Sequence, residues 1–295
     1  METVLERFKK EIDSKLIETQ LAEIQNSVKK GITSGQMKDI LSYIDLTSLN
    51  TADNEEVIIN LTGKVNGFSS CFPGIPNVAA ICTWPSLVET VKRNLNVPGV
   101  QIAAVAGGFP SSQTFLEVKR MEAEKAIEAG AGEIDVVIPV GNFLAGDYIT
   151  VAGEINDLKR AVGEVHLKVI LEVGQLGSES NIRDASILAM QAGADFIKTS
   201  TGKTSPAATY RSVYIMADAI LDFYRKTGKI TGLKPAGGIV EPEDAAVYLE
   251  IVNRLLGEKW LTPRYFRIGA SRLANNLLTA INRFDRQGKD EIIYF

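Results

Sequence analysis

The chain has 295 residues, of which 45% are hydrophobic and 23% are charged, and its formal net charge is −4. This length and composition suit one large α/β domain with a substantial core. No basic cluster indicates a nucleic-acid partner, and no apolar run of about 18 residues indicates a membrane span. The first residues, METVLERFKKEIDSK, are too charged for a signal peptide. We therefore expect a cytoplasmic enzyme with neither nucleic-acid nor membrane partners.

Histidine and cysteine are scarce. The sequence holds one histidine, His166, and two cysteines, Cys71 and Cys82. This excludes a His-rich zinc site and a disulfide framework, and it argues against a His-based catalytic triad. We interpret His166, at the start of a predicted strand, and Cys82, inside another, as structural residues. No metal site is predicted.

The first predicted element is an amphipathic helix over residues 4–28. Its apolar residues recur at spacings of three to five: Val4, Leu5, Phe8, Ile12, Leu16, Leu21, Ile24 and Val28. We interpret residues 1–40 as a helical extension that packs on the remaining chain or on a partner subunit. Residues 41–295 are then a single catalytic domain.

Eight short β-rich runs follow in chain order. They cover residues 43–49, 77–84, 99–107, 132–140, 166–173, 195–201, 231–238 and 266–272. Most lack polar alternation, as expected for parallel strands buried on both faces. Helical stretches separate them, with a predicted capping box at Thr114 and Glu117 and a predicted helix start at Ser205-Pro206. Eight βα units predict an α/β fold of the (β/α)8 TIM-barrel class. The rival open sheet is disfavoured because no GxGxxG follows the first strand.

Ionisable residues interrupt these apolar strands. They are Asp45, Asp135, Lys168, Glu172, Lys198 and Lys234. Residues two apart share a strand face, so Asp45 and Thr47, and likewise Lys168 and Glu172, are expected to point the same way. A buried charge is normally paired or functional. A structural ion-pair network remains the alternative, but six such residues on five strands favour an active site.

Two lysines in one barrel lumen have a specific chemical use. An amine attacks a carbonyl only when neutral, and a neighbouring cation lowers its pKa. Two unit charges about 4 Å apart at an effective dielectric of about 20 repel by about 4 kcal/mol, or roughly three pKa units. Asp135 is then suited to move protons through the steps that follow.

Glycines mark the ends of the last three predicted strands. Thr201-Gly202-Lys203 ends the sixth, Gly237-Gly238 ends the seventh, and Gly269-Ala270-Ser271 lies in the eighth. Phosphate often binds to a barrel after its seventh and eighth strands, and glycine lets backbone N–H groups approach an anion. The sequence therefore predicts a phosphate site here.

In these segments the sequence resembles deoxyribose-phosphate aldolases, from about Tyr43 to Arg283. The shared motifs are IDLT (44–47), AAIC (79–82), EIDVV (133–137), LKVILE (167–172), AGADFIKTSTGK (192–203), LKPAGG (233–238) and RIGAS (267–271). The resemblance implies reversible cleavage of 2-deoxy-D-ribose 5-phosphate to acetaldehyde and D-glyceraldehyde 3-phosphate, without a metal or other cofactor. It implies Lys198 as the Schiff-base lysine, Lys234 as its tuning lysine, Asp135 for proton transfer and Lys168 beside them. The expected substrate and phosphate ligands are Asp45, Thr47, Thr201, Gly202, Lys203, Gly237, Gly238, Gly269, Ser271 and Arg272.

Two positions depart from the family pattern on the phosphate side. Val240 stands where the family often has an arginine, and Arg272 where it often has a second serine. We hypothesise that Arg272 supplies the charge that position 240 lacks; the alternative is that it points outward and caps a helix. Tyr294 is penultimate, whereas some family members use a C-terminal tyrosine in proton exchange, so a tail that merely docks or is disordered is the alternative.

Other functions also remain open from sequence. A Schiff-base aldolase or transaldolase-like enzyme acting on another sugar phosphate keeps the same chemistry. A phosphate-binding barrel without catalysis is a different class, although the set Asp135, Lys198 and Lys234 argues against it. The expected partner is a small phosphorylated sugar. A homo-oligomer, specifically a dimer, is a further possibility that the sequence leaves open.

Overall fold

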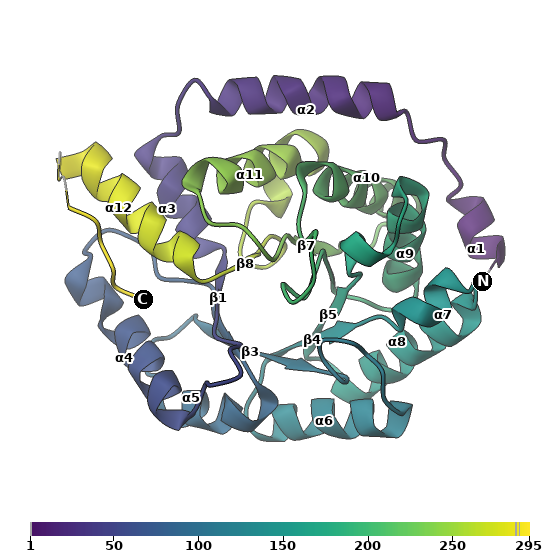
Figure 1. Ribbon diagram of the computed structural model, residues 1–295, viewed down its shortest axis with the longest axis horizontal. Coiled ribbons are helices and arrows are strands. Elements are labelled where there is room, and N and C mark those ends of the chain that lie inside the picture. The colour runs from purple at the N-terminus through teal and green to yellow at the C-terminus, as the bar shows by residue number, and fades with distance from the viewer. Residues whose placement is uncertain (1, 287, 289) are drawn as a thin grey trace.

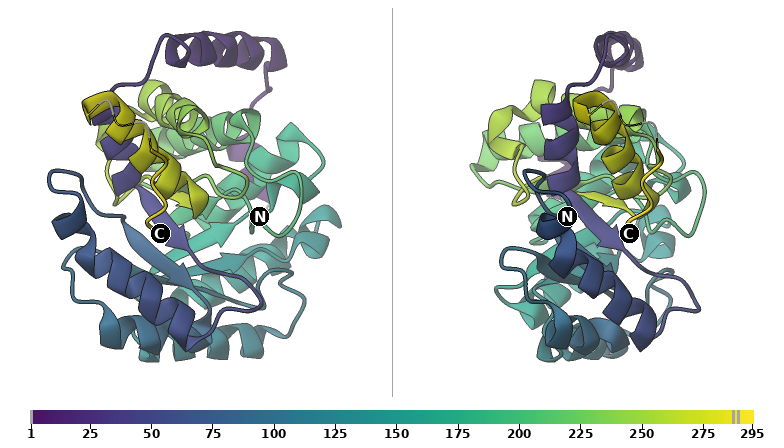
Figure 2. Two further views of the ribbon diagram at one scale, coloured as in Figure 1. Left: turned by 60° about the vertical axis from the view of Figure 1, so that its left-hand side comes forward. Right: turned by 90° about the vertical axis from the view of Figure 1, so that its left-hand side faces the viewer.

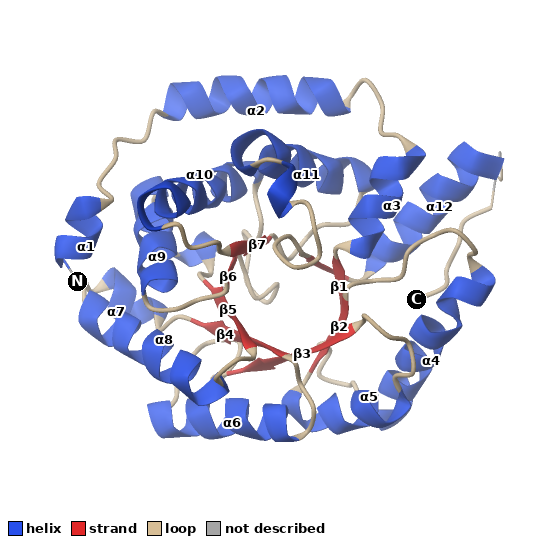
Figure 3. Cartoon of the chain, turned by 180° about the vertical axis from the view of Figure 1, so that it is seen from behind, coloured by secondary structure: helices blue, strands red, loops and turns tan. Residues whose placement is uncertain are grey.

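The computed structural model describes residues 2–286, 288 and 290–295. Its strands form an eight-stranded parallel sheet in the order β7-β6-β5-β4-β3-β2-β1-β8. Bridges that pair Leu233 with Phe266 and Ala236 with Gly269 join β7 to β8 and bring the sheet to a nearly closed barrel. The strands ring the centre when the molecule is viewed down the barrel (Figures 1 and 3). The (β/α)8 fold predicted from sequence is therefore confirmed.

Each strand lies within its predicted run. The bounds are β1 (Ile44–Thr47), β2 (Ala80–Thr83), β3 (Gln101–Ala106), β4 (Glu133–Val137), β5 (His166–Ile170), β6 (Phe196–Lys198), β7 (Gly232–Lys234) and β8 (Ile268–Ala270). Most of these residues are buried. Burial on both faces explains why the sequence shows continuous apolar runs rather than alternation.

Helices surround the barrel (Figure 3). They are α4 (Glu55–Cys71), α5 (Val88–Asn94), α6 (Leu116–Glu128), α7 (Val140–Leu144), α8 (Tyr148–Val162), α9 (Glu179–Gln191), α10 (Tyr210–Thr227), α11 (Pro242–Leu256) and α12 (Arg272–Arg286). Short 3-10 turns lie at η1 (Pro85–Leu87), η2 (Val173–Gln175) and η3 (Glu258–Trp260). No helix among the described residues is both long and apolar enough to cross a membrane.

Three helices precede the first strand: α1 (Glu2–Arg7), α2 (Ser14–Val28) and α3 (Ser34–Ser42). The single helix predicted over residues 4–28 is therefore interrupted. Asp13 starts a new helix by accepting a hydrogen bond from Leu16 N at 2.9 Å. In the interruption, Phe8 is buried and stacks on Phe223 of α10, with ring centroids 5.5 Å apart. Helix α2 lies outside α10 and α11 (Figure 2), so this segment packs on its own barrel.

Both predicted helix starts after strands are wrong. Helix α6 begins after Phe115 without a side-chain cap. Thr114 instead lies in a turn, in which its backbone N–H donates to Ser112 O. Helix α10 begins at Tyr210, where Thr209 and Ser212 form the capping box. The Ser205–Pro206 peptide is cis and precedes that helix. A Cβ at Gly174 would lie 2.0 Å from Pro206 O, so this loop rests on η2 before the helix starts.

The barrel lumen is divided between small apolar and charged side chains. Strands β2 and β3 contribute Ala80, Cys82, Ala103 and Val105, which pack with Leu49. Strands β1, β4, β5, β6 and β7 contribute buried charged residues, which include Asp45, Asp135, Lys168, Lys198 and Lys234 from the predicted set. The candidate catalytic residues therefore lie in the charged half of the lumen.

Candidate active site

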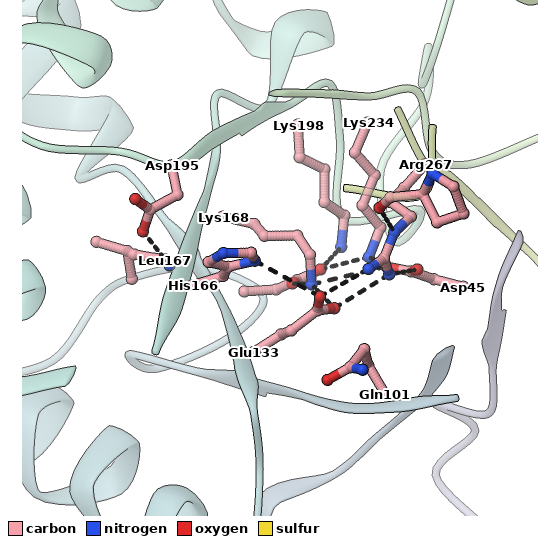
Figure 4. A network of polar contacts seen from close by, with 12 residues as sticks. Asp45, Gln101, Glu133, His166, Leu167, Lys168, Asp195, Lys198, Lys234 and Arg267 are labelled. Carbon is pink, nitrogen blue, oxygen red and sulfur yellow. Dashed lines mark hydrogen bonds and ion pairs between the residues drawn. The ribbon is translucent and has the colours of Figure 1, made fainter. Parts of the chain in front are cut away.

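Asp135 on β4 contacts all three lysines of the charged lumen. The side chains of these lysines, Lys168, Lys198 and Lys234, converge in the barrel (Figure 4). Asp135 Oδ2 accepts hydrogen bonds from Lys198 Nζ at 2.8 Å and Lys234 Nζ at 2.7 Å. Its Oδ1 accepts from Lys168 Nζ at 3.0 Å. The parallel register brings these residues together, because Asp135 pairs with Lys168 and Lys198 pairs with Lys234 on neighbouring strands. The four residues expected to be catalytic therefore form one cluster.

A second set of contacts lies beside this cluster. Arg267 Nη1 is 2.6 Å from Asp45 Oδ1, and Arg267 Nη2 is 2.8 Å from Glu133 Oε1. Lys168 Nζ lies 2.7 Å from Glu133 Oε2, and Lys234 Nζ lies 2.5 Å from Asp45 Oδ2. Together with the contacts of Asp135, these ion pairs make one continuous network across the barrel.

Burial and charge act in opposite directions on the pKa values of this network. Burial would raise the pKa of Asp135, but the ammonium groups of the three lysines hold it well below its usual range. Burial would lower the pKa of Lys234, but the carboxylates of Asp135 and Asp45 outweigh that and raise it. Asp135 is therefore ionised and Lys234 protonated over the ordinary pH range.

Lys198 is the exception among the lysines. Burial lowers its pKa, Asp135 opposes this effect, and the positive charge of Lys234 adds to the lowering. Repulsion by Lys234 was predicted to be the main cause of this lowered pKa, whereas burial is the larger cause. A lowered pKa increases the fraction of neutral amine, which is the nucleophilic form.

A cavity of about 210 Å³ opens beside this network. It is lined by residues from the ends of strands and the loops that follow them: Thr47, Leu49, Asn50, Lys198, Thr201, Gly202, Lys203, Ala236, Gly237, Gly238, Ile239, Val240, Gly269, Ala270, Ser271 and Arg272. Of the network cations, only Lys198 lines it. Binding sites of α/β barrels lie at this end of the strands.

The glycines of the cavity shape its wall in different ways. Gly202 and Gly237 both have positive φ, +76° and +88°, and a Cβ on Gly237 would lie 3.0 Å from Gly202 Cα. The ends of β6 and β7 can therefore approach only as glycine backbones. Gly238 faces open space, so its backbone is accessible to a ligand. A Cβ on Gly269 would lie 3.2 Å from Lys234 Cε, so this glycine makes room for the lysine side chain.

The cationic side chains of the cavity differ in whether they have a hydrogen-bond partner. Lys203 Nζ donates to Leu49 O and lies 6.0 Å from the Trp84 ring centroid. Arg272, the first residue of α12, is exposed and pairs with none of the described residues. Val240 lines the same cavity, and Asn276 of α12 donates to Val240 O at 3.0 Å. The ends of β7 and β8 therefore meet at this place.

Glu172 lies where the alternation of β5 ends. Its φ of +54° turns its side chain away from the face that Lys168 occupies, so the predicted common face is wrong. Glu172 instead accepts hydrogen bonds from Thr201 N at 3.2 Å and Thr201 Oγ1 at 2.5 Å. A left-handed conformation at a residue other than glycine is strained and persists only when its surroundings hold it. Here it fixes the loop that carries Gly202 and Lys203.

Two further expected ligands occupy different places. Thr47 lines the cavity, and its hydroxyl donates to Asp45 O at 2.9 Å. Asp45 is fully buried in the network and does not line the cavity. The structure thus places Asp45 behind Lys234 rather than beside a substrate. Among the described residues, no group of three His, Cys, Asp or Glu side chains is arranged to hold a metal ion.

Two members of the network, Glu133 and Arg267, were not predicted from the sequence. Each was visible in the motifs EIDVV and RIGAS, two residues before Asp135 and Gly269 respectively. The rule that residues two apart share a strand face would have placed both toward the lumen.

The C-terminal tail packs against α4 and α12. The Tyr294 hydroxyl donates to Lys64 O of α4 at 2.7 Å, and its ring packs edge-on against Phe68 and Phe72. Asn275 Oδ1 accepts from the backbone N–H groups of Tyr294 and Phe295 at 2.9 Å. Burial, with Cys71 adding to it, raises the pKa of Tyr294 to about 12. The tail thus docks on α4 and α12 of its own chain.

Comparison with known proteins shows the family to which this chain belongs. Residues 40–253 match the model of the DeoC/LacD family of aldolases. The human deoxyribose-phosphate aldolase is 39% identical over 266 residues, which cover 86% of this chain and 83% of the human protein. The bovine enzyme is 40% identical over 262 residues, which cover 85% and 82%. The tetrameric deoxyribose phosphate aldolase of Aeropyrum pernix aligns with a TM-score of 0.64 at 25% identity, covering 90% of this chain and 97% of that one. The chain therefore belongs to the DeoC/LacD family of aldolases.

Proposed function

We propose that this chain is a class I aldolase that cleaves 2-deoxy-D-ribose 5-phosphate reversibly to acetaldehyde and D-glyceraldehyde 3-phosphate. The observation that carries the proposal is the position of Lys198. It is the one network lysine that lines the cavity, and its pKa is lowered while those of Lys168 and Lys234 are raised. The matches to deoxyribose-phosphate aldolases support the same reaction.

The reaction begins with the neutral amine of Lys198. Its nitrogen attacks the aldehyde carbon of the open-chain sugar, and a proton moves from nitrogen to the former carbonyl oxygen to give a carbinolamine. A second proton, delivered to this hydroxyl, lets it leave as water and gives a protonated imine. This cation is an electron sink directly adjacent to the bond that must break.

Cleavage breaks the bond between C2 and C3 of the sugar. The hydroxyl on C3 gives up its proton and becomes the aldehyde of glyceraldehyde 3-phosphate, while the bonding electrons move onto the imine as an enamine. The enamine carbon then gains a proton, and water releases acetaldehyde and regenerates Lys198. Every proton removed is returned, so the cycle needs no oxidant or reductant.

Asp135 is the proton carrier nearest to the reacting amine. Its Oδ2 lies 2.8 Å from Lys198 Nζ and also contacts Lys234 Nζ at 2.7 Å. Because the lysines hold the pKa of Asp135 low, the carboxylate carries a proton only transiently and passes it on. We therefore assign Asp135 to proton transfer and Lys234 to holding that carboxylate ionised beside Lys198.

The far end of the cavity is suited to the substrate phosphate. Backbone N–H groups near Gly202, Gly237 and Gly238 can approach an anion closely. The first turn of α12, a helix of 15 residues, adds a favourable dipole at Ser271 and the guanidinium of Arg272, which pairs with none of the described residues. A dianionic phosphate at this end positions C1 of the sugar toward Lys198.

A turnover assay tests the proposal. The purified chain is incubated with 2-deoxy-D-ribose 5-phosphate, and both products are measured by independent methods. We expect equal amounts of the two aldehydes, and none from Lys198→Leu, whose fold is verified by circular dichroism. Turnover of a different sugar phosphate alone would retain the Schiff-base chemistry but replace the substrate. Undiminished turnover by Lys198→Leu would contradict the mechanism.

A further inference from the structure

The charged network extends beyond the four residues assigned to catalysis. Glu133 on β4 and Arg267, one residue before β8, lie deeper in the barrel and contact no part of the cavity lining except through other residues. Arg267 holds Asp45 and Glu133, at 2.6 and 2.8 Å, while Glu133 reaches Lys168 at 2.7 Å (Figure 4). Lys168 and Asp45 in turn contact Asp135 and Lys234.

The charges in this network do not cancel when every group is ionised. It contains the four cations Lys168, Lys198, Lys234 and Arg267 and the three carboxylates Asp45, Glu133 and Asp135. None of the seven residues is more than 4% exposed. An uncompensated charge in such a place is costly and is relieved by loss of a proton. The network is balanced when one cation is neutral.

Geometry selects which cation is neutral. A guanidinium does not lose its proton in proteins, which excludes Arg267. Lys234 lies within 2.7 Å of two carboxylates, and Lys168 lies within 3.0 Å of two. Lys198 contacts a single carboxylate, that of Asp135, and is the one of the four that lines the cavity. The surplus positive charge is therefore removed most readily at Lys198.

We propose that Glu133 and Arg267 are positioning residues that set the protonation state of Lys198 through the charge balance of the buried network. The inference rests on the proposed function, in which Lys198 is the nucleophile. Glu133 favours the protonated amine and Arg267 favours the neutral one. Neither residue touches the substrate, so both act only through Lys168, Asp45 and the central Asp135.

Other titratable groups near the network have defined places. Cys82 of β2 faces Lys198 and Lys234 from the apolar half of the lumen. His166 Nδ1 of β5 lies 3.8 Å from Glu133 Oε1 at the barrel end, with 38% of its side chain exposed. Glu172 is directed to Thr201, and Lys203 reaches Leu49 O from the cavity. Apart from the contact of His166 with Glu133, none of the ion pairs among the described residues joins these groups to the seven network residues.

Neutral variants of Glu133 and Arg267 test the proposal, because they should shift the pKa of Lys198 in opposite directions. The readout is the rate of deuterium incorporation into the methyl group of acetaldehyde in deuterated buffer, as a function of pH, because acetaldehyde has no titratable group. Glu133→Gln removes a carboxylate, so the acid limb of the profile should move to lower pH. Arg267→Gln removes a cation, so it should move to higher pH. A unit charge about 10 Å away at an effective dielectric of about 20 gives a shift on the order of one pH unit.

The double variant Glu133→Gln/Arg267→Gln keeps the wild-type surplus of one cation, so its acid limb should return close to the wild-type position. It also removes the carboxylate that loses its guanidinium partner in Arg267→Gln, which protects the fold if that single variant is unstable. Arg267→Lys keeps the charge but loses the fork, and should leave the limb in place while lowering the melting temperature. The same shifts are expected in a His166→Gln background, which removes the imidazole beside Glu133.

A buried ion pair outside the lumen supplies the matched control. Lys119 of α6 and Glu154 of α8 are 2.6 Å apart, and Lys119 is 1% exposed. Glu154→Gln should lower stability without moving the acid limb. Shifts of the same sign in Glu133→Gln and Arg267→Gln, or no shift in Glu133→Gln, would overturn the inference. Borohydride trapping of the wild-type protein separates this failure from failure of the proposed function. If Lys198 is trapped but the shifts fail, only the inference about Glu133 and Arg267 is wrong. If Lys198 is not trapped, the proposed function and this inference both fail.

Discussion

Lys198 and Lys234 donate hydrogen bonds to the same oxygen, Asp135 Oδ2, at 2.8 and 2.7 Å. Two ammonium groups on one carboxylate oxygen share a single negative charge, so at least one of them is poorly compensated. Lys234 has a second carboxylate, Asp45, whereas Lys198 has the cavity. The arrangement thus divides two chemically identical side chains into a fixed cation and an available amine.

Removing the fixed cation should raise the pKa of Lys198. In Lys234→Leu the repelling charge is gone, so a larger share of Lys198 is protonated and the acid limb of the rate profile moves to higher pH. Deuterium exchange into acetaldehyde against pH measures the shift. Lys119→Leu, which removes a buried lysine outside the lumen, should leave the limb unmoved. An unchanged limb in Lys234→Leu would show that Lys234 has only a structural role.

Arg272 is expected to bind the substrate phosphate. Its guanidinium is unpaired among the described residues and borders the same cavity as Val240. Arg272→Ser should raise KM for deoxyribose 5-phosphate by about 10-fold, worth about 1.4 kcal/mol, with little effect on unphosphorylated deoxyribose. The variant Arg272→Ser/Val240→Arg, which moves the cation across the cavity, should recover part of the loss. Equal effects on the two substrates would show that Arg272 does not recognise phosphate.

Glu172 should affect phosphate recognition through the loop that it holds. Without its carboxylate, Thr201 loses both hydrogen bonds and the backbone at Gly202 and Lys203 is less well fixed. Glu172→Ala should raise KM for deoxyribose 5-phosphate by roughly 10-fold while changing acetaldehyde exchange little. Glu172→Gln, which keeps an acceptor oxygen, should have a smaller effect. An equal loss in both assays would mean that the mutation damages the barrel as a whole.

The tail should contribute stability rather than catalysis. Tyr294 and Phe295 pack on Phe68, and Asn275 holds their backbone. Deletion of residues 290–295 should lower the free energy of unfolding by about 1 to 3 kcal/mol, since it exposes buried aromatic surface. Acetaldehyde exchange should be unchanged, as it should be in Tyr294→Phe. A fall in exchange in both variants would show that the tyrosine hydroxyl reaches the amine during turnover.

Much of the fold was predictable because its signals are local. The eight apolar runs predicted the strands, and charged residues within them marked the lumen. Helix starts were less predictable, since Thr114 and Ser205 have capping chemistry but lie in loops. Thr114 belongs to a local turn with Ser112, and the loop after Ser205 packs on η2. Glu172 shows the same limit, because the alternation of a strand fails where the backbone turns left-handed. Such a turn depends on its neighbour Thr201, which periodicity does not reveal.

The cluster of Asp135 with Lys168, Lys198 and Lys234 was predicted from the sequence, but the position of each side chain along the barrel axis was not. Sequence alternation identified Asp45 and Thr47 as neighbours on a strand, yet Thr47 lines the cavity and Asp45 lies behind Lys234. How far a side chain lies along the barrel axis depends on the stagger of the strands, which a single strand does not encode. Glu133 and Arg267, which lie deeper in the barrel, were overlooked for that reason.

The most direct test of the account is the identity of the lysine that binds the carbonyl. Sodium borohydride added to the protein with acetaldehyde reduces the imine and leaves an ethyl group on the reacting nitrogen. Digestion and mass spectrometry then locate the modification. The account predicts one modified lysine, Lys198, in the peptide containing residues 196–203, and complete loss of turnover in step with labelling. Modification of Lys168, Lys203 or Lys234 in its place, or none at all, would contradict it.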